Sequence, residues 1–280
     1  MATKERFALV TGRRLVGLRR CGKGGIGEAL VVEYKRQGLR PVATLLPFED
    51  SQHLDDAGTM WFPLDVTQED SVRELKNHML ELTGGYTMTA IDTDVAAVAK
   101  MFDVNVFGPM RMVHHFHDML IQSSGTIVSI GSVGGIVPYV YGSAYNATKA
   151  ALHHWSNTLR VEMEPLGVKV VIIISGNIGT NILKGDQGVG RELRKGSYFS
   201  PLAQEFKDHV NRVPDTTDRF QYASKVVQQS LRSAPPAWFW YGKTTRIVRF
   251  LDSFAWRNVW DGFMWNMFNF KKLQAARKSL

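Results

Sequence analysis

A tyrosine and a lysine lie four residues apart, Tyr145 and Lys149, and Ser132 precedes the tyrosine by thirteen residues. On a helix, residues at this spacing share one face, so the phenol and the ammonium would be neighbours. A nearby cation lowers the pKa of a phenol from its usual value of about 10, which would make Tyr145 an acid–base group near neutral pH. Ser132 ends an apolar run that predicts a strand, where its hydroxyl could hydrogen-bond a substrate oxygen.

Each of these signals is common by itself. A Tyr-x-x-x-Lys pair is often only a solvated helix face, and a glycine-rich turn often serves only packing. Here Gly24, Gly25 and Gly27 lie between a predicted strand and a predicted helix. Glycine allows the backbone to approach a pyrophosphate closely, and a helix N-terminus supplies N–H donors. The combination of these features indicates an enzyme more strongly than any one of them.

The elements that would position these groups alternate along the chain. Apolar runs predict strands at 6–12, 41–46, 60–66, 125–132 and 168–175, and helical spacing predicts helices at 24–38, 68–82, 95–121 and 144–163. Strands that alternate with helices of this length indicate βαβ crossovers. We therefore predict an α/β fold with a doubly wound, Rossmann-type parallel sheet.

With these motifs in place, the chain resembles the short-chain dehydrogenase/reductase family over residues 6–225. Thr11-Gly12 followed by Gly25-Ile26-Gly27 is similar to the family's TGxxxGxG cofactor turn. The stretches CGKGGIG, HHWSNTLRVEM and SYFSPL resemble, more closely, fungal members similar to NADPH-dependent 1-acyldihydroxyacetone-phosphate reductase.

The resemblance implies a mechanism in which NADPH delivers a hydride to a ketone carbon while Tyr145 protonates the developing alkoxide. Ser132 would orient the carbonyl, Lys149 would also bind the nicotinamide ribose, and Asn105 would hold a water that returns the proton. The implied catalytic residues are Asn105, Ser132, Tyr145 and Lys149, and the implied cofactor-binding residues are Gly12, Lys23, Gly25, Ile26, Gly27, Asp65, Asn105, Tyr145, Lys149 and Thr180. Asp65 would contact the adenine, and Thr180 the nicotinamide carboxamide.

The end of the second predicted strand bears on the choice between NAD and NADP. An acidic residue there would accept the ribose 2′-hydroxyl of NAD. The sequence at 44–47 is Thr-Leu-Leu-Pro, with neither an acid nor an arginine. Lys23 in the glycine turn could pair with a 2′-phosphate, although it could also be a solvated lysine. We expect NADP(H) as the cofactor.

The chain departs from the family pattern at two places. The segment RRLVGLRR at 13–20 interrupts the glycine turn, and the family's central strand with its NNAG turn is missing after Tyr86. A parallel sheet that loses a central strand must re-pair its neighbours or leave backbone groups unsatisfied. Both departures begin and end abruptly, and the sequence on either side of each follows the family pattern. This favours a gene-model error over adaptation. The alternative function is a catalytically impaired or non-catalytic binding or scaffold protein derived from the family.

The net charge of +8 is concentrated in two segments, 13–20 with four arginines and 235–280 with a net charge of +6. The rest of the chain is nearly neutral, which argues against a nucleic-acid partner. One cysteine, no secretory signal and no apolar run of about 18 residues predict an intracellular, cytoplasmic protein that does not cross a membrane.

Five histidines, at positions 114, 115, 117, 153 and 154, invite comparison with a metal site. Adjacent residues on a helix point about 100° apart, and no carboxylate or cysteine lies at ligand spacing nearby. We therefore predict no metal and interpret these histidines as helix-surface or interface residues.

We expect a dehydrogenase domain at 1–234 and an appended tail at 235–280. The tail holds five of the seven tryptophans, and its residues 246–259 form an apolar face opposite several arginines. Such a helix suits a membrane interface, for example the surface of the endoplasmic reticulum or a lipid droplet. It could instead cover the sheet or substrate pocket, or form a homo-oligomer contact. The expected substrate is a lipophilic ketone, either an acyl-glycerone phosphate or an intermediate of secondary metabolism.

Overall fold

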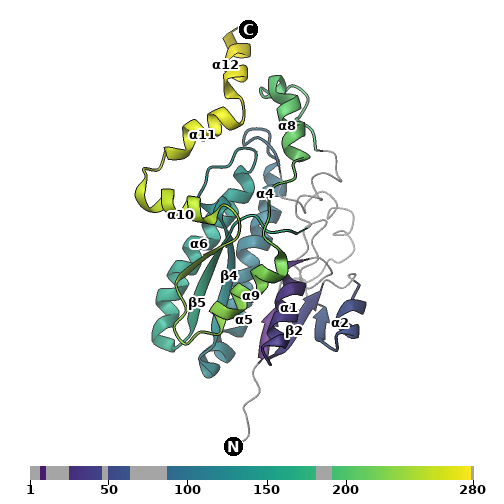
Figure 1. Ribbon diagram of the computed structural model, residues 1–280, viewed down its shortest axis with the longest axis vertical. Helices are drawn as coiled ribbons and strands as arrows, with labels where there is room; N and C mark the ends of the chain where they lie inside the picture. Colours follow the sequence, from purple (N-terminus) through teal and green to yellow (C-terminus); the bar gives the residue numbers. More distant parts are fainter. Residues whose placement is uncertain (1–6, 11–24, 46–49, 64–86, 181–190, 279–280) are drawn as a thin grey trace, which may run out of the picture.

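The computed structural model describes residues 7–10, 25–45, 50–63, 87–180 and 191–278. Two three-stranded parallel sheets form its centre (Figure 1). The first has the order β1 (Phe7–Val10), β2 (Arg40–Leu45), β3 (Met60–Pro63), and the second has the order β4 (Thr126–Ser132), β5 (Lys169–Ser175), β6 (Trp238–Tyr241). The predicted α/β class with parallel strands is confirmed.

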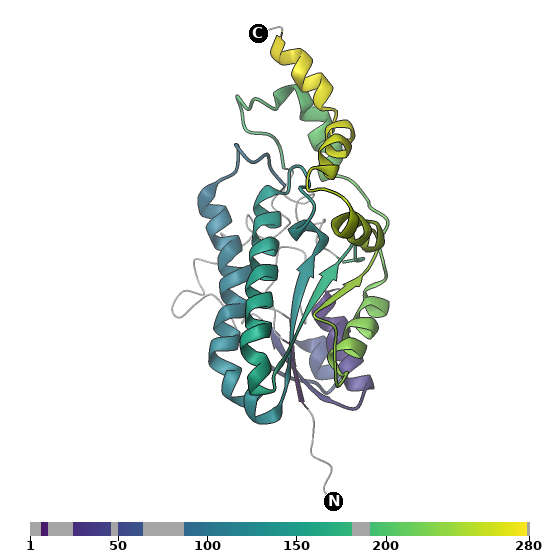
Figure 2. The ribbon, with the colours of Figure 1, turned by 90° about the vertical axis from the view of Figure 1, so that its left-hand side faces the viewer.

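Helices cover both faces of these strands, as a doubly wound fold requires. Figure 2 shows α5 and α6 side by side on one face of the second sheet, with α9 and α1 on the other. The helical elements are α1 (Ile26–Arg36), α2 (Gln52–Asp56), α4 (Val95–Phe102), the π-helix η1 (Asp103–Phe107), α5 (Gly108–Ser123), α6 (Ser143–Met163), α8 (Ala203–Val210), α9 (Arg219–Ser230), α10 (Thr245–Phe254), α11 (Val259–Met267) and α12 (Phe270–Lys278), with short 3₁₀ turns η2 (Val133–Gly135), η3 (Glu164–Leu166) and η4 (Ser200–Leu202).

The strand β5 is the most deeply buried element of the second sheet. Its four central residues, Val171 to Ile174, have no exposed surface. A strand covered by helices on both faces has no solvent side, so its sequence is continuously apolar rather than alternating. This explains why a simple run of valine and isoleucine located the strand in the sequence.

No hydrogen-bonded ladder joins β1 to β4 within the described residues, so the two sheets remain separate there. Side chains connect them instead: Val10 of β1, Ile173 of β5 and Tyr222 of α9 belong to one buried cluster. At the surface of this cluster, the Tyr34 hydroxyl lies 2.9 Å from that of Ser230. The separation is the structure expected when a central strand is missing. Residues 64–86, which include the helix predicted at 68–82, lie outside the described residues.

The segment 235–280 does not begin as a tail. Its first element, β6, pairs in parallel with β5, in a register that runs from Ile172↔Trp238 to Ser175↔Tyr241. A boundary after residue 234 would separate this strand from its own sheet. The sequence WFWY lacks the polar–apolar alternation of a half-buried strand, so its local pattern gives little signal of one.

The three C-terminal helices lie beyond the carboxyl ends of β4–β6 (Figure 1). Val248 of α10, Met264 of α11 and Phe268 are buried in a cluster that also contains Tyr141 and Phe206. The cluster therefore joins these helices to the end of the sheet at which parallel strands carry functional sites.

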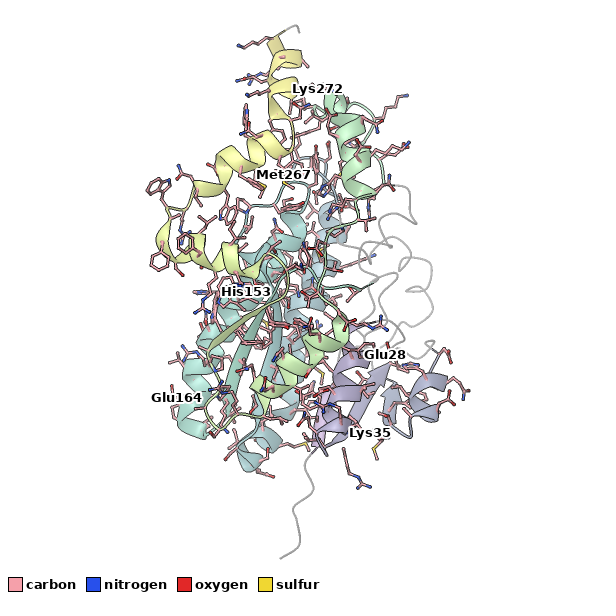
Figure 3. The ribbon with its side chains drawn as sticks, viewed as in Figure 1. Glu28, Lys35, His153, Glu164, Met267 and Lys272 are labelled. Atoms are coloured by element: carbon pink, nitrogen blue, oxygen red, sulfur yellow. The ribbon has the colours of Figure 1, made fainter. Side chains whose placement is uncertain are left out.

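An ion pair ties the last helix to α8. The Lys272 ammonium (labelled in Figure 3) lies 3.0 Å from the Glu205 carboxylate. The amphipathic helix predicted at 246–259 ends earlier, at Phe254, and its apolar residues divide between a buried and an exposed side. Among the described helices, none combines the length and apolar character needed to span a bilayer.

The position of β6 predicts how the chain tolerates truncation. Ending the chain at Ala234 removes β6 and opens the buried edge of β5, so cooperative thermal unfolding should be lost. Ending it at Asn269 removes α12, which has no buried residue, and should lower Tm by only a few degrees. Circular dichroism melting of the two truncations and the full chain tests this. A cooperative transition in the shorter chain would contradict the assignment of β6 to the sheet.

Candidate active site

The candidate site lies at the carboxyl ends of the strands. Ser132 is the last residue of β4, and the turn at 175–180 follows β5. In open parallel sheets, ligands bind outside this edge, where helix N-termini and strand ends converge. The same edge therefore receives α1, which begins after β1.

The backbone and side chain of Ser132 are both fixed by hydrogen bonds. The chain turns sharply into η2, and the Gly134 N–H donates to Ser132 Oγ at 3.0 Å. The Ser132 N–H donates to Nε2 of His153 at 3.1 Å. The Tyr145 side chain, from the first turn of α6, lies beside that of Ser132: a Cβ on Gly134 would lie 3.1 Å from Tyr145 Cε1 and 3.4 Å from Ser132 Oγ. The predicted serine and tyrosine are thus neighbours.

The electrostatics of Tyr145 differ from the prediction. Burial raises the pKa of the Tyr145 phenol, and the hydrogen bond with Ser132 offsets only part of this effect. The expected lowering by Lys149 was wrong for this structure. The Lys149 ammonium donates to the Ile130 carbonyl at 2.9 Å and lies 5.7 Å from the centre of the Tyr145 ring, and its charge does not outweigh the effect of burial on the phenol.

Asn105 reaches the same helix from the π-helix η1. Its side chain is buried, and its Nδ2 donates to Thr148 Oγ1 at 3.1 Å. Thr148 in turn donates to the Tyr145 carbonyl at 2.8 Å. All four predicted catalytic residues therefore contact or belong to α6 or the end of β4. Thr148 was not predicted, since a threonine between Tyr145 and Lys149 carries no signal of its own.

The start of α1 suits a dinucleotide phosphate. Gly25 is the N-cap residue, no side chain caps the helix, and both Gly25 and Gly27 are buried. Within the described residues, no side chain at the N-cap position accepts from the first-turn N–H groups, and the helix N-terminus carries the partial positive charge that attracts a pyrophosphate. Ile26 is the first residue of the helix. Gly12, Lys23 and Asp65, also predicted to bind the cofactor, lie outside the described residues.

The turn after β5 is held in place by β6. The Gly176 N–H donates to the Tyr241 carbonyl at 3.0 Å, and a Cβ on Gly176 would overlap the Lys243 carbonyl oxygen. A glycine is therefore required where these two segments of the backbone approach each other. Thr180, predicted to meet the nicotinamide, ends this turn, and its N–H donates to the Ile178 carbonyl at 2.8 Å. Together with the start of α1, these residues fit a dinucleotide.

One histidine was assigned wrongly. His114, His115 and His154 are exposed on helices, as predicted, but His153 is buried and contacts Ser132. Its position one helical turn after Lys149 could have indicated this, because residues at this spacing share a face. Among the described residues, no group of three or more His, Cys, Asp or Glu could hold a metal ion.

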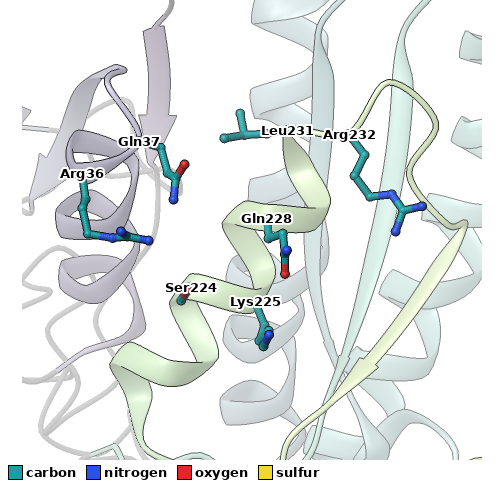
Figure 4. Close-up of a pocket in the computed structure, with 7 residues that line it drawn as sticks. All are labelled: Arg36, Gln37, Ser224, Lys225, Gln228, Leu231 and Arg232. Carbon is teal, nitrogen blue, oxygen red and sulfur yellow. The ribbon is translucent and has the colours of Figure 1, made fainter.

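A surface groove of about 330 Å³ lies elsewhere, between α1 and α9 (Figure 4). Arg36 and Gln37 at the end of α1 and Arg232 after α9 are among the residues that line it. Because α1 begins at the carboxyl edge of the sheet, its last turn lies at the opposite edge. The groove is thus remote from Ser132 and Tyr145, and we assign no function to it.

Comparisons with known proteins give matches in both sequence and fold. The sequence model described as short chain dehydrogenase matches residues 20–188. The chain is 61% identical over 288 residues to "Short-chain dehydrogenase virD" of Hypocrea virens, covering 99% of this chain and 97% of that protein. It is 36% identical to "NADPH-dependent 1-acyldihydroxyacetone phosphate reductase" of Schizosaccharomyces pombe, covering 80% and 78%. The protein belongs to the short-chain dehydrogenase family.

The family match begins at residue 20, at the end of the 13–20 segment. The 288 aligned positions exceed the 280 residues of this chain, so at least eight of them have no residue here. The fold itself is similar to a short-chain dehydrogenase from Burkholderia cenocepacia in complex with NADP, with a TM-score of 0.66 at 18% identity over 93% of this chain and 98% of that one.

The packing around Ser132 predicts the effect of one glycine substitution. A Cβ on Gly135 would lie 2.5 Å from His153 Cε1 and 2.9 Å from the Ala150 backbone nitrogen. Gly135→Ala should therefore lower the free energy of unfolding by about 1–3 kcal/mol. Gly262→Ala in α11 meets no atom within 4 Å and should leave it unchanged or raise it by up to about 1 kcal/mol. Urea unfolding compares them, and equal effects would contradict this packing.

Proposed function

We propose that this protein is an NADP(H)-dependent reductase of a ketone on a lipophilic substrate. The observation that carries the proposal is that the Tyr145 and Ser132 side chains lie side by side, next to Gly134, at the carboxyl edge of a parallel sheet. Tyr145 also packs against the apolar cluster of the C-terminal helices. A proton donor and an apolar surface thus occur together at the edge where such folds bind their ligands.

In the proposed reaction, bound NADPH supplies the hydride that adds to the carbonyl carbon. The Tyr145 hydroxyl donates its proton to the carbonyl oxygen as negative charge develops there, and Ser132 Oγ holds the same oxygen. Because burial raises the pKa of Tyr145, the phenol keeps its proton at neutral pH and can act as the acid. Asn105 is proposed to hold the water that returns the proton.

Lys149 is proposed to bind the nicotinamide ribose and to stabilise the phenolate left on Tyr145. An ammonium group has three donors, so Lys149 can bind a ribose hydroxyl without releasing the Ile130 carbonyl. Gly12, Gly25, Ile26, Gly27, Asp65 and Thr180 are proposed to complete the cofactor site.

For the choice of cofactor, β2 ends at Leu45, and neither Thr44 nor Leu45 can accept a ribose hydroxyl as an acid would. Lys23 is proposed to pair with the 2′-phosphate of NADP(H). The NADP complex of the structural neighbour and the name of the yeast relative support the same cofactor.

The surroundings of Tyr145 suggest the class of substrate. Partly buried Ile136, Tyr139 and Trp240 line the cluster against which the phenol packs. The Tyr141 hydroxyl is buried there without a hydrogen-bond partner among the described residues, so it could bind a polar group of the substrate. An acyl-glycerone phosphate, or an intermediate of secondary metabolism, would fit this mixture of apolar surface and isolated polar groups.

Two observations favour the alternative of a catalytically impaired or non-catalytic protein. The two sheets share no ladder in the part of the chain that the structure describes, and the Lys149 ammonium is engaged by a backbone carbonyl. NADPH tests whether the cofactor site is intact, because a ligand that binds only the folded state raises Tm. A chain whose Tm does not respond to NADPH would support the alternative.

We also propose that α10 and α11 make peripheral contact with an anionic membrane. Phe254 and Trp256 are 78% and 75% exposed, and further large apolar side chains on these helices are also exposed, namely Ile247, Phe250, Phe263, Trp265 and Met267. Arg246, Arg249 and Arg257 are exposed beside them. Aromatic residues flanked by arginine match the acyl boundary and the negative headgroups of such a surface. The opposite faces of these helices pack towards Tyr145, so lipophilic substrate could pass from the membrane to the site.

The role of Tyr145 predicts a separation of turnover from binding. Tyr145→Phe should lower ketone reduction by at least about 100-fold, because it removes the proton donor, while NADPH affinity should change little. Tyr198→Phe is the control, since Tyr198 is 81% exposed and should keep its turnover. NADPH fluorescence titration and NADPH absorbance report the two quantities. Undiminished turnover in Tyr145→Phe would exclude the proposed mechanism.

The membrane proposal predicts that attachment depends on both parts of this surface. The full chain should sediment with phosphatidylserine vesicles, more weakly with phosphatidylcholine vesicles, and less at 1 M salt, where screening shortens to about 3 Å. The double change Phe250→Ser and Phe254→Ser should abolish sedimentation. The control, Tyr198→Ser with Val213→Ser, removes exposed apolar side chains elsewhere and should not.

Two results would oppose the membrane proposal. Equal sedimentation of both double variants would show that α10 does not anchor the protein. If analytical ultracentrifugation shows a dimer that only the Phe250/Phe254 variant loses, the surface binds a second copy of the chain instead.

A further inference from the structure

His153 contacts the candidate active site directly, through the backbone of Ser132. It lies one turn after Lys149 on α6 and is only 4% exposed. The ring of Trp238, from β6, covers it at a centroid distance of 5.4 Å. An imidazole in such a place has a restricted set of partners, and its Nε2 is the acceptor for the Ser132 N–H.

The backbone of β4 explains why this hydrogen bond is available. The Gly125 carbonyl faces β5, because it accepts from the Lys169 N–H at 3.0 Å. Backbone groups alternate in direction along a strand, so the groups of Ile130 and Ser132 face away from β5. On that side β4 has no partner strand within the described residues. Lys149 takes the Ile130 carbonyl, and His153 takes the Ser132 N–H.

The space around the imidazole is shaped for a ring. A Cβ added to Gly131 would collide with His153 Nε2, and a Cβ added to Gly135 would lie 2.7 Å from Nδ1. Gly131, just before Ser132, and Gly135, the last residue of η2, thus leave room for the imidazole ring at the end of β4. Since Nε2 accepts, the ring carries its single proton on Nδ1 and is neutral. Burial, with the charge of Lys149, lowers the pKa of His153 to about 4.

We propose that His153 is a positioning residue for the candidate active site: its neutral imidazole holds the Ser132 N–H and thereby sets Ser132 Oγ against the Tyr145 hydroxyl. The proposal rests on the proposed reductase function, in which Ser132 and Tyr145 act on the same oxygen. It assigns His153 no contact with substrate or cofactor. The proposed role depends on the hydrogen-bond acceptor of the His153 side chain. A substitution can remove this acceptor while it keeps the volume of the side chain.

The test compares two substitutions in the full-length chain. His153→Gln retains an acceptor near the position of Nε2, whereas His153→Leu fills the space without one. His154→Leu, at the exposed neighbouring position, is the matched control. The first readout is the ring-carbon NMR signal of Tyr145, assigned with Tyr145→Phe, because the hydrogen bond to Ser132 determines its environment. This readout requires no turnover.

The Tyr145 signal should shift in His153→Leu and stay close to its original position in His153→Gln and His154→Leu. Where the full chain reduces a ketone, His153→Leu should also lower kcat by about tenfold with KM nearly unchanged, and His153→Gln should restore most of it. An unshifted Tyr145 signal in His153→Leu, or equal shifts in the Gln and Leu variants, overturns the proposal. A full chain without turnover would count against the proposed function, while the Tyr145 signal would still decide the role of His153.

Discussion

The candidate active site depends on the hydrogen bonds that side chains of α6 form with the unpaired backbone edge of β4. Ile130 and Ser132 direct backbone groups away from β5, towards the side on which the family has a further strand. Buried backbone groups without partners are costly, and here two side chains of α6 supply the missing hydrogen bonds. The same contacts fix the distance between β4 and α6. Ser132, on the strand, and Tyr145, on the helix, therefore meet.

This arrangement changes the electrostatics of the site. Burial of the phenol outweighs the effect of its polar neighbours, so the pKa of Tyr145 rises even though Lys149 lies nearby. Because His153 is neutral, the Lys149 ammonium carries the only positive charge of this pair of side chains. In the proposed reduction, this charge would stabilise the phenolate that remains when Tyr145 donates its proton.

The C-terminal helices link the site to the surface. Val248 and Met264 face the cluster on which Tyr145 packs, while Phe250 and Phe254 of the same segment face outward. A helix with apolar residues on both sides needs a partner for each, and the protein provides only the inner one within the described residues. The proposed membrane contact and the proposed lipophilic substrate are therefore two consequences of one arrangement.

The sequence alone determined the α/β class, the strands at 125–132 and 168–175, and the grouping of Asn105, Ser132, Tyr145 and Lys149. Local periodicity determines the class and the strands, so they can be recognised before folding, whereas the grouping of the four residues rests on the resemblance to the short-chain dehydrogenase family. Only the tertiary structure decided that WFWY is a strand of the sheet, that Lys149 faces Ile130, and that His153 is buried against Ser132. Each of these depends on which strand edge is left open. Which edge is open is decided by the pairing of strands that lie far apart in the chain, and no local sequence pattern predicts this pairing.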